Sequence, residues 1–186
     1  MKVTLTHLYG TNREVADRAR TTIGLDEGDK PVSDAYMRKL YLCEHSPIRT
    51  QLYKIRFEGL PTYVSTHFVR HKIGVEHFVS TQRVDRTGVN RNERKQTDPV
   101  IHEMVLNPQA FITISRKRLC SCADRETIKA WKMVLEELKK INKPLYDVCV
   151  VDCIYRGHCY EHKTCNYHKT EAFAKKLHKY RENINV

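Results

Sequence analysis

The sequence predicts a single α+β domain, from its length and from two hydrophobic patterns. The chain has 186 residues, the size of one domain, and 40% of them are hydrophobic, which is ordinary for a globular protein. Alternating apolar and polar residues predict half-buried strands, and apolar residues three and four apart predict amphipathic helices. No internal repeat or low-complexity segment divides the chain, so we expect one domain at 1–174 and a basic tail at 175–186.

Turn and cap residues place the expected elements along the chain. Strands are predicted at 2–8, 51–58 and 76–84, and helices at 13–22, from 33, at 61–72, from 107, at 125–140 and at 144–149. Asn107 before Pro108, and Asp124 before an apolar stripe, are typical of helix N-termini. The polar stretch 87–98 is predicted to be a loop.

The charge of the chain favours partners that carry phosphate. The formal net charge is +11 and the pI is about 9.4. Lys and Arg are spread over the whole chain and no nucleic-acid-binding signature is present, so a nucleic-acid partner stays possible but is not favoured. The apolar runs are short and the N-terminus has no secretory-signal pattern, so we expect a cytoplasmic protein without a membrane partner.

The most informative stretch is HFVRHKIGVEHFVSTQR, which contains the basic triplet Arg70-His71-Lys72. Ser80, Thr81 and Arg83 follow about one strand later. Cations and hydroxyl donors are suited to a phosphate or diphosphate. The alternative is a surface basic cluster paired to nearby carboxylates.

Three segments carry motifs in a fixed order along the chain: Glu44 to Arg49, residues 70–83, and Asn107 to Arg118. Together they resemble the flavin-dependent thymidylate synthase family. The first resembles its Glu-His segment, and residues 70–83 resemble its pattern of Arg-His-Arg, Ser, Asn-Glu, Ser and Arg. Asn107 and Arg118 keep the family's spacing of eleven residues, and the Cys-rich ending 153–166 resembles the C-terminus of many members. The resemblance covers about residues 40 to 166.

The resemblance implies a central mixed sheet flanked by helices, and a homotetramer. It implies reductive methylation of dUMP at C5 to give dTMP, with FAD as cofactor and with methylene-tetrahydrofolate and NADPH as co-substrates. The residues expected to hold the flavin are His45, Arg70, His71, Lys72, Asn107 and Arg118. Ser80, Thr81 and Arg83 are expected at the catalytic centre, where Ser80 and Arg83, together with His67, would bind the nucleotide.

The sequence also departs from the family pattern. Lys72 replaces an Arg and so loses the planar fork of a guanidinium. Phe78 stands where the family has Glu, and Gln109 replaces an Arg that holds flavin. One residue is inserted before Arg83, and the segment 84–106 is a few dozen residues shorter than in the family. These departures leave open a paralogue that modifies another pyrimidine nucleotide, or that only binds flavin or nucleotide.

Seven cysteines allow two interpretations. An odd count without a secretory signal favours reduced thiols. Cys149, Cys153, Cys159 and Cys165 could instead bind zinc, which takes four soft ligands. A basic, metal-stabilised nucleic-acid-binding protein is therefore a further alternative.

Overall fold

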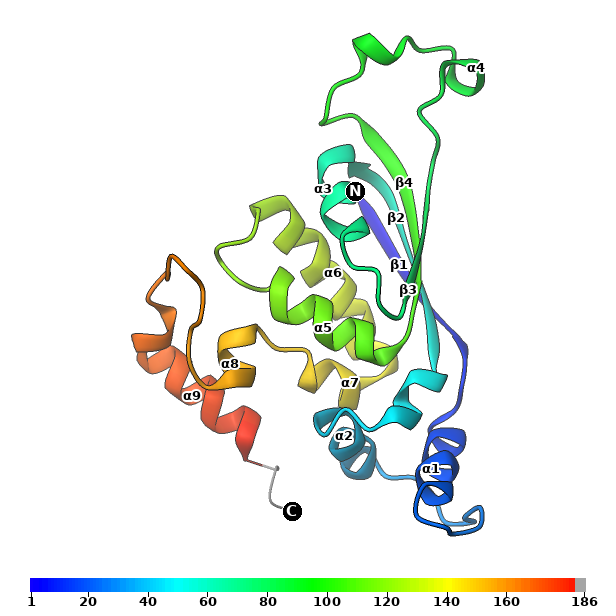
Figure 1. The fold of residues 1–186 in the computed structure, drawn as a ribbon, viewed down its shortest axis with the longest axis vertical. Helices are drawn as coiled ribbons and strands as arrows, with labels where there is room; N and C mark the ends of the chain where they lie inside the picture. Colours follow the sequence, from blue (N-terminus) through cyan, green and yellow to red (C-terminus); the bar gives the residue numbers. More distant parts are fainter. Residues whose placement is uncertain (183–186) are drawn as a thin grey trace.

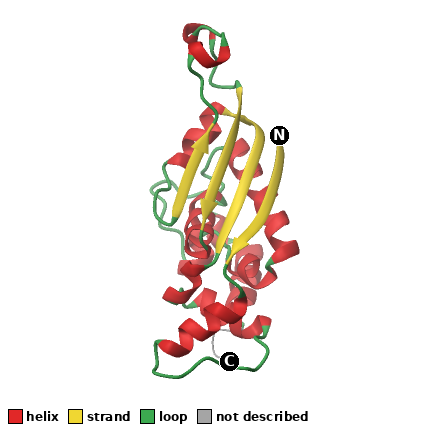
Figure 2. Ribbon diagram, turned by 90° about the vertical axis from the view of Figure 1, so that its right-hand side faces the viewer, coloured by secondary structure: helices red, strands yellow, loops and turns green. Residues whose placement is uncertain are grey.

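Four strands form one sheet, and helices cover one of its faces (Figure 1). The computed structural model describes residues 1–182. Seen from the side, the sheet lies in front of helices α3, α5 and α6 (Figure 2). The strands are β1 (Lys2–Tyr9), β2 (Leu52–Pro61), β3 (Val75–Val79) and β4 (Pro99–Leu106). The helices are α1 (Asn12–Thr21), α2 (Asp34–Leu42), η1 (Ser46–Thr50), α3 (Thr62–Val69), α4 (Val84–Thr87), η2 (Arg91–Glu93), α5 (Pro108–Arg118), α6 (Arg125–Ile141), α7 (Lys143–Val148), α8 (Asp152–Arg156), η3 (Tyr167–Lys169) and α9 (Glu171–Arg181).

The α+β class is confirmed, but the expected mixed sheet is wrong because every strand pair is antiparallel. The strand order is β1-β2-β4-β3. Met104 in β4 pairs with Ile55 of β2 on one side and His77 of β3 on the other. Strand β4 is thus inserted between two strands that both run opposite to it.

The central strand β4 lies in a segment where no strand is predicted from the sequence. Its inner residues Val100, Met104 and Leu106 are buried, and so is His102, which is fully inaccessible to solvent. Ile101 lies on the other side of the strand and is exposed. Because apolar residues stand on both sides, the period-two alternation that predicts a strand is masked.

The connection from β2 to β3 also differs from expectation. Strand β2 continues through a bulge at Gly59 (φ 75°) as far as Pro61, so the helix begins one residue later than predicted. Helix α3 ends at Val69, and the predicted helical extension through Lys72 is instead a turn. Strand β3 ends at Val79, five residues before the predicted end.

Several other elements confirm the sequence prediction. Thr11 caps α1 in a capping box with Glu14, and Asn107 and Asp124 cap α5 and α6 through their side chains. The apolar stripe of α6 is buried, with Trp131 fully inaccessible. The Trp131 indole N–H donates to Ser115 Oγ at 2.9 Å, which ties α6 to α5.

A second, smaller core joins the C-terminal helices. Ile154 of α8 packs with Phe173 and Tyr180 of α9. Helix α9 spans residue 175, where the expected basic tail begins, and the division into a domain and a tail stays a prediction. Residues 183–186 of that tail lie outside the described residues. Within residues 1–182, no helix has both the length and the apolar character needed to cross a membrane.

Candidate anion-binding site

A short turn, residues 70–74, carries the basic triplet between α3 and β3; we call it the basic turn. Arg70 and Lys72 are exposed. Gly74 has φ 72°, and a Cβ atom there would lie 2.8 Å from the Asn107 side chain. The Asn107 backbone N–H donates to Gly74 O at 3.0 Å. Glycine is therefore needed for both the backbone conformation and the close packing against α5.

Arg118, at the end of α5, is fixed against the basic turn. Its Nε donates to His71 Nε2 at 2.9 Å, and its terminal nitrogen donates to the His67 carbonyl at 2.6 Å. Burial, and then nearby Arg70, lower the pKa of Arg118. Arg70 therefore adds a second positive charge near Arg118.

His71 takes part as a neutral ring. A guanidinium only donates hydrogen bonds, so the Nε2 that faces Arg118 is an acceptor and the proton sits on Nδ1. Burial, followed by Arg118 and His77, lowers the pKa of His71 to about 4. The positive charge expected at His71 is absent at neutral pH, and the ring instead offers one Nδ1–H donor.

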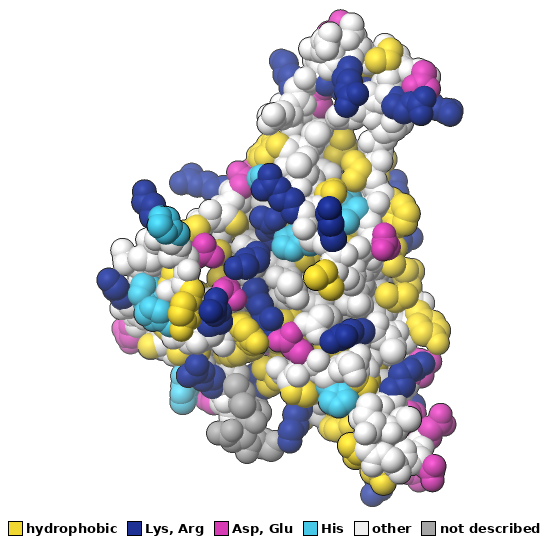
Figure 3. Space-filling model, viewed as in Figure 1, with side chains coloured by type: hydrophobic (Ala, Val, Ile, Leu, Met, Phe, Trp, Pro, Cys, Tyr) yellow, Lys and Arg dark blue, Asp and Glu magenta, His cyan; other side chains and the backbone are white. Residues whose placement is uncertain are grey.

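Figure 3 shows Lys and Arg side chains gathered in the middle of one face, with His side chains among them. The basic turn contributes Arg70 and Lys72, both exposed, to the surface charge. A surface of one sign attracts and orients anionic ligands before they bind.

A second group, which sequence reasoning only partly identified, surrounds Glu44. This residue has φ 51° and accepts short hydrogen bonds from Gln109 and Arg116. The Arg116 guanidinium lies 3.5 Å from the centre of the Tyr155 ring. Gln109, which stands at the position of a flavin-binding Arg in the resemblance, is therefore engaged with Glu44. Non-glycine residues in the left-handed region are uncommon and concentrate at functional sites.

His45 follows directly in the chain and is half-buried. Its Nδ1 atom is buried and has no hydrogen-bond partner among the described residues. A buried polar atom costs free energy when it has no partner. His45 therefore has an unused hydrogen-bonding atom that a ligand could satisfy.

The expected nucleotide-binding residues lie at the other end of β3. Ser80 Oγ accepts from the Ile101 N–H at 3.0 Å, and Thr81 Oγ1 accepts from the Arg83 N–H at 3.2 Å. The Arg83 guanidinium binds both carboxylate oxygens of Asp85, at 2.9 Å each. The five residues of β3 separate this group from the basic turn by about 17 Å.

His67 lies with the basic turn rather than with Ser80 and Arg83. Its Nδ1 is 2.8 Å from Thr127 Oγ1 at the start of α6, and its carbonyl accepts from Arg118. Among residues 1–182, no hydrogen bond joins His67 to Ser80 or Arg83.

The predicted zinc site is not confirmed. Among residues 1–182, no three His, Cys, Asp or Glu side chains are grouped so that they could hold a metal ion. Cys149 is buried in the main core, and burial raises the pKa of its thiol to about 12. Cys153, Cys159 and Cys165 border a cavity of about 580 Å³ beside α8.

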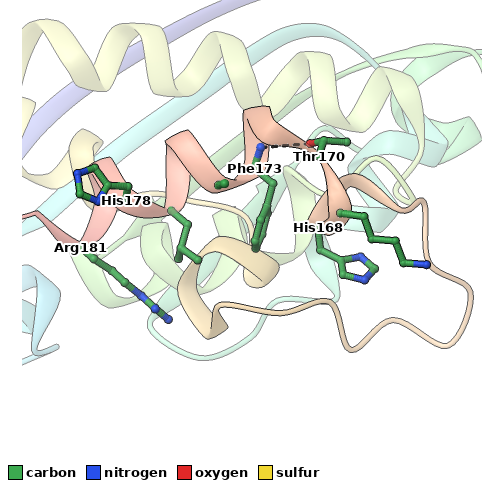
Figure 4. Close-up of a pocket in the computed structure, with 8 residues that line it drawn as sticks. His168, Thr170, Phe173, His178 and Arg181 are labelled. Atoms are coloured by element: carbon green, nitrogen blue, oxygen red, sulfur yellow. Dashed lines mark hydrogen bonds between the residues drawn. The ribbon is translucent and has the colours of Figure 1, made fainter.

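Another pocket, of about 490 Å³, lies along α9 (Figure 4). His168, Phe173, His178 and Arg181 line it, and Thr170 Oγ1 accepts from the Phe173 N–H at 3.2 Å to cap the helix. None of its lining residues belongs to the basic turn.

Solved structures share this fold. Thymidylate Synthase X (ThyX) from Helicobacter pylori, with FAD and dUMP, matches with a TM-score of 0.62 at 13% identity, over 80% of this chain and 99% of that one. A UMP/dUMP methylase, PolB from Streptomyces cacaoi, bound with 5-Br dUMP, matches with a TM-score of 0.61 at 12% identity, over 79% of this chain and 94% of that one. No protein-family model matches the sequence, and no curated protein matches it. The fold expected from the motifs is confirmed, apart from the direction of the strands.

Proposed function

We propose that this protein is a flavin-dependent enzyme that methylates a pyrimidine nucleotide at C5, with dUMP as substrate and dTMP as product. The observation that carries the proposal is the Arg118–His71 contact behind the exposed Arg70 and Lys72. It lies in a chain that has the fold of a structure solved with FAD and dUMP.

The residues of the basic turn fit the diphosphate of FAD. Arg70 and Lys72 supply two positive charges, and His71 supplies a neutral Nδ1–H donor between them. Arg118 fixes the ring of His71 and adds a third charge nearby. We expect Asn107 to act on the cofactor indirectly, because its side chain caps α5 and packs against Gly74.

His45 is the residue we propose for contact with the flavin ring. Its buried Nδ1 has no partner in the described chain, and a flavin ring offers both donors and acceptors at its edge. When bound, the flavin would supply the redox and one-carbon chemistry, with methylene-tetrahydrofolate and NADPH as co-substrates. The role of the protein is to bind and orient the reactants and to exclude water.

Ser80, Thr81 and Arg83 are proposed to hold the nucleotide phosphate and to orient the pyrimidine for reaction. The Arg83 guanidinium donates to both oxygens of the Asp85 carboxylate, and it can donate to two oxygens of a phosphate in the same way. Asp85 would then be displaced from Arg83 when the nucleotide binds.

The separation of the two groups supports a homo-oligomer, which we propose to be a tetramer. The basic turn and Arg83 lie at opposite ends of β3, so one chain does not bring its own flavin and nucleotide residues together. A second copy could place its nucleotide group beside the basic turn of the first. The cysteines, which are all free, support a reducing location such as the cytoplasm.

The test is the visible spectrum of the purified protein titrated with FAD, followed by addition of dUMP. We expect bound flavin, a spectral change on adding dUMP, and release of tritium from dUMP labelled at C5 when the folate and NADPH are present. The Arg70→Gln variant should lose flavin binding, whereas Arg125→Gln, which removes an exposed Arg from α6, should not. Absence of flavin binding would overturn the proposal.

A second candidate function keeps the flavin and changes the nucleotide. Gln109 is bound to Glu44, and exposed Phe78 stands where the resembling family has Glu, so the ligand set differs from that of the family. PolB, which shares the fold, is described as a UMP/dUMP methylase. Tighter binding and turnover of UMP than of dUMP would favour this candidate.

A further inference from the structure

Three side chains form a continuous hydrogen-bonded chain that ends on the basic turn. Ser65 Oγ lies 3.0 Å from His102 Nδ1, and His102 Nε2 lies 3.0 Å from His77 Nδ1. His77 Nε2 then lies 2.7 Å from the carbonyl oxygen of His71. Ser65 and His102 are buried and His77 is half-buried. We call these three residues the relay.

The sheet and core fix the relay in place. His77 pairs across the sheet with Met104, two residues from His102, so the two imidazoles are diagonal neighbours on the helix-covered face. Their ring centres are 5.2 Å apart. The rings of Phe57 and Phe68 pack around His102, with centres 6.1 and 6.3 Å away.

The bond between His77 and the His71 carbonyl fixes the donor and the acceptor in every other bond of the relay. A carbonyl only accepts, so His77 Nε2 donates to His71 O. A neutral imidazole has one N–H, so His77 Nδ1 accepts and His102 Nε2 donates to it. His102 Nδ1 then accepts from the Ser65 hydroxyl. Burial, followed by His77, lowers the pKa of His102 to about 4, which keeps this ring neutral.

The relay ends where the candidate anion-binding site begins. The carbonyl that His77 holds belongs to His71, whose ring accepts from Arg118. We propose that Ser65, His102 and His77 are positioning residues, which hold the basic turn so that Arg118 and the His71 N–H face a bound phosphate. The identity of the ligand, FAD, rests on the proposed function, whereas the hydrogen-bond directions do not.

The first experiment uses the ligand-free protein and is independent of the proposed function. Nitrogen-detected NMR of the imidazoles should show the proton on Nδ1 of His71 and on Nε2 of both His77 and His102. It should also show a slowly exchanging Nε–H of Arg118. A proton on Nδ1 of His77 would overturn the relay.

The second experiment compares FAD dissociation constants among three variants. His102→Leu removes the relay, and we expect the Kd to rise about tenfold and the Arg118 Nε–H to exchange faster. His102→Gln keeps an N–H that can donate to His77, so the Kd should return to within about threefold of the wild-type value. Met104→Leu changes the same buried face beside His77 but keeps all three relay side chains, so it should leave the Kd unchanged.

The outcomes of these experiments test the relay and the proposed function separately. If wild-type protein binds no FAD, the proposed function fails, and the Arg118 exchange rate in the variants alone tests the relay. Equal Kd values and exchange rates in His102→Leu and wild type would overturn the relay, as would an equal loss of binding in Met104→Leu. If His102→Leu does not fold, Ser65→Ala, which removes one oxygen atom, should mix the tautomers of His102 and weaken FAD binding in the same direction.

Discussion

Arg118 Nε donates to His71 Nε2 at 2.9 Å, across 47 positions of sequence, and this contact determines the charge of the candidate site. Because the ring must accept, His71 is neutral, and the site carries the charges of Arg70, Lys72 and Arg118 only. The imidazole contributes a hydrogen-bond donor with a fixed direction instead of a positive charge. A neutral donor held between cations can select the position of a phosphate oxygen, whereas a mobile cation would bind it with less specificity.

Replacing Arg118 with Lys should weaken FAD binding about tenfold. A Lys ammonium keeps the charge but cannot donate from one planar group to both His71 and His67. Isothermal titration with FAD measures the effect. Arg125→Lys, at an exposed position in α6, is the matched control and should bind as wild type. If Arg118→Lys binds FAD equally well, charge alone explains the contribution of Arg118.

Stability should fall as the pH is lowered from about 6.5 to about 4. The folded-state pKa values of His71 and His102 are both about 4, below the ordinary value of 6.5. Between these values the unfolded chain binds more protons than the folded one, so the free energy of unfolding decreases as the pH falls and is unaffected by these groups above that range. The fully buried His102 alone accounts for up to about 3 kcal/mol.

Urea denaturation between pH 7.5 and 4.5 measures this dependence. The His102→Gln variant, which does not titrate at this position, should show a smaller loss of stability on acidification. His162→Gln, at an exposed position, should follow the wild-type curve. A His102→Gln curve that parallels the wild type would show that His102 contributes nothing to the pH dependence.

Gly74→Ala should destabilise the protein more than Gly88→Ala. Both glycines have positive φ, 72° and 69°, so both substitutions incur the cost of about 1–2 kcal/mol of a left-handed alanine. Only at Gly74 would the new methyl group lie 2.8 Å from another side chain, that of Asn107, whereas Gly88 has no atom within 4 Å. Thermal unfolding of the two variants separates backbone strain from steric conflict. Equal losses would mean that Asn107 moves aside without cost.

The sequence predicted the helices that have clear caps and one apolar stripe. Asp124 and the stripe through Trp131 define α6 almost to the residue, because cap chemistry and helical period agree there. Strand β4 was missed because Ile101 on its outer side hides the alternation of its buried inner residues. The helix expected through Lys72 stops at Val69, because tertiary packing of Gly74 against Asn107 requires a turn that local propensity does not reveal.

Only part of the candidate site could be predicted, because contacts between distant segments of the chain are not visible in the sequence. Residue types identified the basic triplet and the family resemblance identified Arg118, and the structure brings His71 and Arg118 into contact. The hydrogen bonds within the site could not be predicted. The neutrality of His71 and the bonds of His77 and His102 depend on segments that are distant in sequence. The zinc prediction is not confirmed: a regular spacing of cysteines does not reveal that Cys149 lies inside the main core, and no group of metal ligands forms among residues 1–182.

Asp85→Asn should strengthen binding of dUMP or UMP to this protein. In the structure both oxygens of the Asp85 carboxylate occupy the Arg83 guanidinium, which is the group proposed to bind the nucleotide phosphate. The pair is exposed, with 70% of the Arg83 side chain and 54% of the Asp85 side chain accessible, so its loss should leave stability almost unchanged. Removing the competing carboxylate should lower the Kd about threefold to tenfold.

The control for this prediction is Asp29→Asn, which makes the same change of charge at an exposed position outside the proposed site. Nucleotide titration at two salt concentrations distinguishes a local effect from a general one, because a change in net charge alone acts on both variants and is screened by salt. If the two variants gain affinity equally, Asp85 does not compete for Arg83. If Asp85→Asn instead weakens binding, the ion pair positions Arg83 for the phosphate, and Asp85 stays paired with Arg83 when the nucleotide is bound.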